Sequence, residues 1–163
     1  GLTHARLGRV EHAIQHYQQA LEIAREIGDR RGEGADLGNL GLAYRYLGQV
    51  EQAIQHYQQQ LVIVREIGDR RGEGNALGNL GAAYYHLGQV AQAIQHYHQQ
   101  LDITREIGDR RGEGNALGNL GSAYAALGQV EQAIQHYQQA LEIAREIGDR
   151  RRQATRLGLL GNA

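Results

Sequence analysis

The chain has 163 residues, a formal net charge of −1 at pH 7, and no Cys, Pro, Met, Phe or Trp. The lack of Cys excludes disulfide frameworks, thiolate zinc sites and thiol nucleophiles. Arg and acidic residues are interleaved, and no apolar run is long enough to span a bilayer, so we expect neither nucleic acid nor membrane as a partner. We expect a cytoplasmic protein and, because even an initiator Met is absent, a piece of a longer chain.

The sequence repeats itself every 40 residues. Residues 41–80 and 81–120 are identical at 33 of 40 positions. One glycine stands at the same place in five copies of the phrase: Gly1, Gly41, Gly81, Gly121 and Gly161. This period predicts a single repeat array. Its units cover about 1–30, 31–70, 71–110 and 111–150, with a partial unit over 151–163.

Apolar residues within each copy recur at three- and four-residue steps, which is the pattern of amphipathic helices. Ala133, Tyr137 and Leu141 share one such stripe. Gly108 and Gly128 are placed to end helices. The pattern predicts helices, in chain order, at about 10–28, 31–47, 50–68, 71–87, 90–108, 111–127, 130–148 and 151–162. Connections of two or three residues make neighbouring helices antiparallel.

A short motif marks each helix pair, and in one copy it reads Leu117-x2-Leu120-Gly121-x2-Tyr124 followed by Ala133-x3-Tyr137. This resembles the signature of the tetratricopeptide repeat family, Trp-x2-Leu-Gly-x2-Tyr followed by Ala-x3-Phe. The resemblance covers the whole chain, and the 40-residue period is similar to a longer-helix subclass of that family. It implies an all-α fold of tandem antiparallel hairpins stacked as a right-handed superhelical solenoid, with a protein or peptide as partner.

Two positions depart from the family pattern. Gln60 and Gln100 stand where the family has a small residue after the aromatic one. A carboxamide that packs tightly needs hydrogen-bond partners. We therefore expect these side chains to extend to the edge of the repeat.

The resemblance implies that the first helix of each pair lines a concave wall, and the copies differ most along that helix. The variable positions carry Leu2, Leu42, Ala82 and Ser122; Ala5, Arg45, Tyr85 and Ala125; and Arg6, Tyr46, His86 and Ala126. Arg and Tyr are enriched at protein interfaces. Variation at these positions favours a ligand groove, and drift on an exposed face is the alternative.

Asparagines recur on the same wall. Asn39, Asn79 and Asn119 share one position, and Asn75 and Asn115 lie one turn earlier. A carboxamide can pair with the N–H and C=O groups of an extended peptide of any sequence. A helix cap or an inter-repeat hydrogen bond is the alternative role. The predicted partner-binding residues are Asn39, Asn75, Asn79, Asn115, Asn119, Leu42, Arg45, Tyr46, Tyr85, His86 and Ser122.

The remaining groups of polar residues do not indicate a catalytic or metal site. His16, His56, His96 and His136 recur near the apolar edge, which favours packing over metal binding because no third ligand accompanies the His12–His16 pair. Arg pairs such as Arg110–Arg111 favour a solvated face or inter-repeat ion pairs. The chain has one Ser, few Thr and no Walker lysine. We expect no catalytic residue, no metal and no cofactor.

The two ends of the array predict a second mode of association. The chain begins inside one helix and stops inside another, and Leu157, Leu159 and Leu160 have no following helix to cover them. We expect head-to-tail association or end exchange between molecules. The leading function is therefore a scaffold that holds a peptide or protein segment in its concave groove. The alternative is a self-assembling or spacer array, natural or engineered, that associates through its ends.

Overall fold

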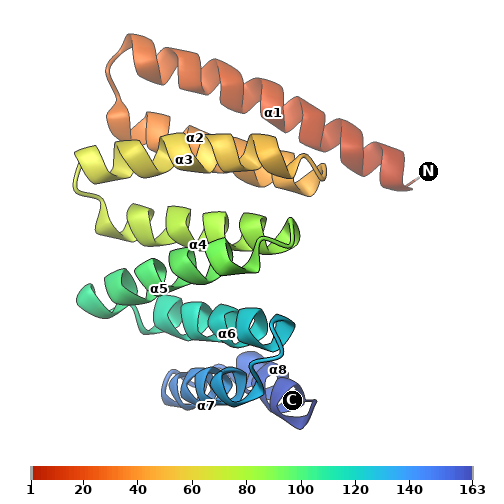
Figure 1. Ribbon diagram of the computed structural model, residues 1–163. Coiled ribbons are helices and arrows are strands. Elements are labelled where there is room, and N and C mark those ends of the chain that lie inside the picture. Colours follow the sequence, from red (N-terminus) through yellow and green to blue (C-terminus); the bar gives the residue numbers. More distant parts are fainter. Residues whose placement is uncertain (1, 163) are drawn as a thin grey trace.

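The computed structural model describes the backbone of residues 2–162 and the side chains of residues 8–162, and over this range it contains eight helices and no strand (Figure 1). The helices are α1 (Leu2–Glu26), α2 (Arg30–Tyr46), α3 (Val50–Glu66), α4 (Arg70–His86), α5 (Val90–Glu106), α6 (Arg110–Ala126), α7 (Val130–Glu146) and α8 (Arg150–Gly161). The all-α prediction is confirmed. No helix in the described range is long and apolar enough to cross a membrane.

The helices form a stack of antiparallel hairpins. The most extensive contacts join α2 with α3, α4 with α5 and α6 with α7, and consecutive hairpins then pack on one another. α1 and α8 lie at opposite ends of the stack (Figure 1). In addition, α2 contacts α4 and α4 contacts α6. The first helices of the hairpins therefore share one wall, as the family resemblance implies.

A glycine in the left-handed conformation follows every helix from α1 to α7. Gly108, for example, has a φ of 68°, and the Asp109 N–H behind it donates to the Thr104 carbonyl at 2.8 Å. Such a glycine lies outside the helix. The predicted ends at 28, 68, 108 and 148 are therefore wrong by two residues. Asp109 then caps α6, because its carboxylate accepts the Gly112 N–H at 2.9 Å.

The beginning of the chain also differs from the prediction. α1 starts at Leu2 and continues through Gly8, although the equivalent Gly48, Gly88 and Gly128 have φ values of 77°, 74° and 72° and separate two helices. Residues 2–7 form less than two helical turns, which is too short for an independent helix. Continuing α1 gives this segment backbone hydrogen bonds that a break at Gly8 would remove.

Each hairpin is held together by a tyrosine ring that lies against a glycine. Tyr57, Tyr97 and Tyr137 are at most 3% exposed. A Cβ atom on Gly81 would come within 2.5 Å of the Tyr97 ring, and one on Gly121 would be as close to the Tyr137 ring. The two helices of each pair therefore approach closely at this glycine, since only glycine leaves room for the ring.

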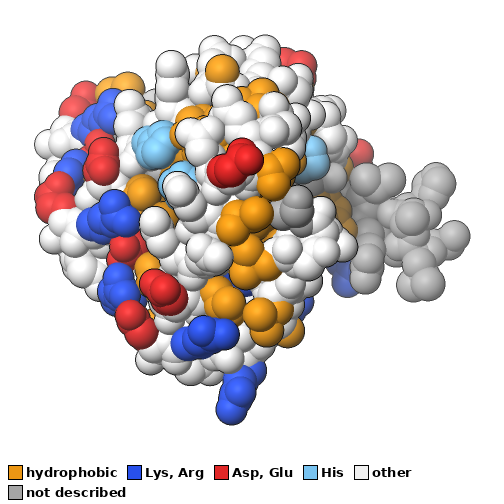
Figure 2. Space-filling view, turned by 60° about the horizontal axis from the view of Figure 1, so that its bottom comes forward, with side chains coloured by type: hydrophobic (Ala, Val, Ile, Leu, Met, Phe, Trp, Pro, Cys, Tyr) orange, Lys and Arg blue, Asp and Glu red, His pale blue; other side chains and the backbone are white. Residues whose placement is uncertain are grey.

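A ladder of ion pairs links successive hairpins. Glu73 is 6% exposed and accepts from the Arg65 Nε of the preceding hairpin at 2.7 Å and from Arg70, which also pairs with Glu106 within its own hairpin. The hydrogen bond with Arg70 lowers the pKa of Glu106. The same pattern recurs around Glu33 and Glu113. Basic and acidic side chains gather along one edge of the molecule in Figure 2.

Candidate functional site

The wall formed by α2, α4 and α6 contains a hollow of about 570 Å³. We call it the carboxamide hollow because seven of its lining side chains end in a carboxamide: Asn39, Asn75, Asn79, Asn115, Asn119, Gln60 and Gln100. The five predicted asparagines thus lie together. Their repetition at two registers, one turn apart, of successive helices brings them together, and we call these five side chains the asparagine row.

The asparagine side chains are not used by the fold. Within the described residues, none of the five makes a hydrogen bond through its side chain, and the helix caps come instead from Asp29, Asp69, Asp109 and Asp149. Asn39 and Asn75 are exposed and the other three are partly buried. The row therefore offers unmet donors and acceptors to the hollow.

The expectation that Gln60 and Gln100 reach the edge of the repeat is wrong. They are 9% and 8% exposed, and their carboxamides lie over Gly38 and Gly78, where a Cβ would come within 2.5 Å of the Gln Nε2. The missing Cβ atoms make the room for these long side chains. The Oε1 atoms of both residues are buried without a hydrogen-bond partner. Both carboxamides line the hollow from beneath the asparagine row.

The next place in this row is filled by Arg156, which sequence reasoning missed. Ala140 stands where Gln60 and Gln100 stand in the inner copies, and the guanidinium of Arg156 from α8 lies over Gly118 in the place of the missing carboxamide. Burial lowers the pKa of Arg156. Two differences between the copies could have revealed this contact. The copy that has the short Ala140 in place of a Gln is followed by Arg156, where the equivalent residues are short, so a long side chain lost at one position is replaced by a long one at the other.

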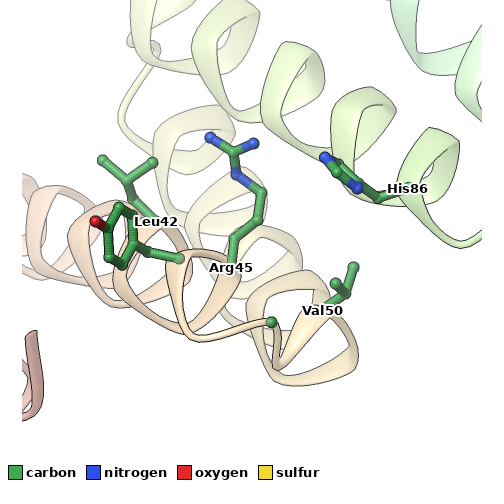
Figure 3. Close-up of a pocket in the computed structure, with 6 residues that line it drawn as sticks. Leu42, Arg45, Val50 and His86 are labelled. Atoms are coloured by element: carbon green, nitrogen blue, oxygen red, sulfur yellow. The ribbon is translucent and has the colours of Figure 1, made fainter. Parts of the chain in front are cut away.

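A second hollow, of about 290 Å³, lies at the C-terminal end of α2. We call it the apolar hollow; it is lined by Leu42, Arg45, Tyr46, Gly48, Val50 and His86. In Figure 3, Leu42 and Arg45 rise from α2, and His86 faces them from α4. Leu42 and Tyr46 are 49% and 61% exposed, so their apolar surfaces are open to a ligand. Four of the predicted residues therefore meet here.

Two predicted residues lie apart from these hollows. Tyr85 is 37% exposed and lines neither of them. The Ser122 hydroxyl donates to the Gly118 carbonyl at 3.1 Å and accepts from the Tyr137 hydroxyl at 3.2 Å. The fold thus already uses the hydroxyl of Ser122.

The histidine ladder packs between helices. His56, His96 and His136 stack on Tyr44, Tyr84 and Tyr124, with ring centroids 5.1, 5.2 and 5.2 Å apart. The Nδ1 atoms of the three histidines are buried without a partner, and burial lowers the pKa of each ring. The structure describes no group of three side chains that could hold a metal ion. The expected packing role is confirmed for these three rings.

The hairpin geometry agrees with a family match. A family model of the tetratricopeptide repeat matches residues 1–67, 72–146 and 114–163. The chain belongs to the tetratricopeptide repeat family. Repeats of this family generally serve as non-catalytic protein-interaction scaffolds. No curated protein matches the sequence of this tetratricopeptide repeat array.

Solved structures show the same fold at low sequence identity. BtubC from P. vanneervenii has a TM-score of 0.79 and 23% identity, over 87% of this chain and 59% of that chain. Aspartyl phosphate phosphatase F from Bacillus subtilis has a TM-score of 0.89 and 17% identity, over 94% and 40%. TPR-like repeats of a kinesin light chain from Podosopora anserina have a TM-score of 0.79 and 21% identity, over 95% and 77%. The array thus spans less than two thirds of the first two chains.

Proposed function

We propose that this tetratricopeptide repeat array is a scaffold that holds an extended peptide segment in the groove along α2, α4 and α6. The observation that carries the proposal is the carboxamide hollow, whose five Asn side chains have no hydrogen-bond partner in the described structure. Peptide N–H and C=O groups pair with carboxamides whatever the side chains between them. The apolar hollow beside the row adds a place for a large side chain of the ligand.

The spacing of the row supports an extended ligand. Packed helices lie roughly 8–10 Å apart, and α2, α4 and α6 contact one another in order. An extended chain advances about 3.3 Å per residue. Each Asn of the set Asn39, Asn79 and Asn119 would therefore meet about every third residue of the peptide.

The double substitution of Asn79→Ala and Asn119→Ala is expected to weaken peptide capture about thirtyfold, since two lost hydrogen bonds of about 1 kcal/mol each remove about 2 kcal/mol and 1.4 kcal/mol is a factor of ten. The probe is a fluorescent peptide selected from a random library against the unmodified chain, and the readout is fluorescence anisotropy. The control replaces Gln59 and Gln99, exposed carboxamides of α3 and α5, with Ala. Equal affinity of both double variants would remove the asparagine row from the proposal.

Self-association is a second candidate, and the end helices favour it. Leu157 of α8 is 53% exposed, whereas the equivalent Leu37, Leu77 and Leu117 are at most 1% exposed. Ile23 of α1 is likewise 56% exposed, whereas Ile63, Ile103 and Ile143 are 4–5% exposed. These are the two faces that the first and second helices of an inner hairpin bury against each other, as Gly34 of α2 and Ile63 of α3 do. One copy's α8 is therefore complementary to another copy's α1.

Head-to-tail association predicts larger species as the concentration of the chain rises. Sedimentation velocity should show this increase, and Leu157→Glu should abolish it because a carboxylate would replace the apolar contact. Val62→Glu, at a side chain that is 56% exposed on α3, is the matched control and should leave the increase unchanged. A single monomeric species at every concentration would contradict this candidate.

A further inference from the structure

The two arginines that open each first helix have different environments. Arg70 and Arg110 belong to the ion-pair ladder, where each bridges two glutamates. Their neighbours Arg71 and Arg111 are exposed and make no hydrogen bond or ion pair in the described structure. The ladder therefore uses only the first arginine of each pair.

Arg71 and Arg111 line one hollow of about 480 Å³, which we call the arginine hollow. It adjoins the carboxamide hollow, because Asn75, Gln100 and Asn115 line both. The two arginines thus stand at the rim of the groove in which we place the peptide. They lie at the same register of α4 and α6.

A buried acceptor in the same hollow also lacks a partner. Gln100 is 8% exposed, and its Oε1 makes no hydrogen bond. Two of the other polar side chains around it are engaged, since the Thr104 hydroxyl donates to the Leu101 carbonyl at 3.0 Å and the Asp109 carboxylate accepts from the Gly112 N–H at 2.9 Å. Asn75 and Asn115, which also line the hollow, make no side-chain hydrogen bond in the described structure. The hollow therefore has two arginines without a hydrogen bond or ion pair, and among its unmet acceptors the Gln100 Oε1 is the one that is buried.

The glutamates near this rim are held in the ion-pair ladder, and the pKa of Asp149 is lowered by hydrogen bonds from Arg152 and, less strongly, by the charge of Arg111. Glu73 and Glu113 are each bound by two arginines, and Glu106 and Glu146 are bound by Arg70 and Arg110. Asp109 is the single carboxylate that lines the arginine hollow. The chain has a net charge of only −1, yet this rim of the groove is cationic.

We propose that the arginine hollow selects an acidic segment, with carboxylates of an extended peptide on Arg71 and Arg111 and a backbone N–H on the Gln100 Oε1. This proposal rests on the peptide-binding function proposed above. Since α4 and α6 are adjacent, the same spacing of roughly 8–10 Å places the two carboxylates about three residues apart. A nucleic-acid backbone also carries anions, but the adjoining carboxamide hollow offers both donors and acceptors to peptide N–H and C=O groups, which favours a peptide.

The test compares three labelled synthetic peptides of equal length. The first has Asp at every third position and Ala elsewhere, the second has Asn in place of each Asp, and the third has the same Asp residues placed together. We expect the first to bind tightest, with an affinity that falls as salt is added. Equal binding of the first two would overturn the acidic preference and leave the peptide groove standing. Equal binding of the first and third would overturn the spacing.

The variant that tests the residues is Arg71→Gln with Arg111→Gln. Exposed ion pairs contribute up to about 1 kcal/mol each, so we expect about a tenfold loss of affinity for the first peptide and little change for the Asn peptide. The matched control is Arg31→Gln with Arg151→Gln, which removes the same charge at the same register outside the hollow. An equal loss in the control would overturn the site.

Two further outcomes are decisive. If no peptide binds any form of the chain, the peptide groove and this inference both fail. If a single-stranded oligonucleotide displaces the first peptide from the unmodified chain and binds more tightly than the peptide does, a nucleic-acid partner replaces the acidic peptide. Circular dichroism of each variant checks that the helices are retained.

Discussion

Gly81→Ala is expected to lower the free energy of unfolding by about 2 kcal/mol. A Cβ on Gly81 would come within 2.5 Å of the Tyr97 ring, which is 3% exposed and has no room to move away. Overpacking of this kind costs up to about 3 kcal/mol, and the better helix propensity of Ala returns about 1 kcal/mol. Urea unfolding followed by circular dichroism measures the difference.

The chain contains a control for this substitution. Gly161 of α8 has the same place in the repeat, and a Cβ there would meet nothing within 4 Å. Gly161→Ala should therefore leave the free energy of unfolding nearly unchanged. Tyr97→Leu should also be less damaging in the Gly81→Ala background than alone, because the two residues share one contact. Equal destabilisation by the two Ala substitutions would contradict the proposed role of the ring.

Mild acid is expected to destabilise the array. Burial lowers the pKa of His56, His96 and His136 below its ordinary value of 6.5 in the folded chain. Nearby Arg25 and Arg65 act in the same direction on His56 and His96, and His98 and Arg105 do so on His136. The unfolded chain then binds more protons below pH 6.5. The stability that these rings contribute is full above that pH and is lost as the pH falls through 6.5 toward the folded pKa.

Urea unfolding at a series of pH values between 8 and about 5 tests this expectation, because below that range carboxylates also titrate. Replacing His56, His96 and His136 with Gln should flatten the dependence of the free energy of unfolding on pH. His12→Gln, at an exposed ring on α1, is the control and should leave the dependence in place. If the free energy of unfolding of the triple variant depends on pH as steeply as that of the unmodified chain, groups other than these three histidines cause the acid sensitivity.

The fold could be predicted from the sequence because the signals for helices and for turns recur in every copy of the repeat. The apolar stripe around Tyr137 occurs in every copy, and each copy has a glycine and an aspartate at the same joint. Local pattern, turn chemistry and period all agree. The predicted helix limits differ from the structure by two residues where the left-handed glycine was counted as helical, and by one residue at each end of α2, α4, α6 and α8. They also fail at Gly8, where too few residues precede it for a separate helix.

Part of the candidate site could also be predicted from the repetition. Asn39, Asn79 and Asn119 occupy the same position in successive copies, so their alignment can be predicted without knowing how the side chains pack. The burial of Gln60 depends on the absence of a Cβ on Gly38, a contact between helices that a single-helix pattern does not contain. Arg156 lies over Gly118 only because Ala140 is short. Contacts in which a long side chain fills the space left by a short one on a neighbouring helix can be found only from the three-dimensional structure.

The near identity of the hairpins also has a consequence for refolding. Interfaces built from the same residues, such as those of Tyr57 with Gly41 and Tyr97 with Gly81, do not distinguish one neighbour from another. Within one molecule, the short joints at Gly68 and Gly108 leave a helix able to reach only its own neighbours. Between molecules no such tether exists. Refolding at high protein concentration should therefore yield hairpins exchanged between chains, and dilution should favour the correct order.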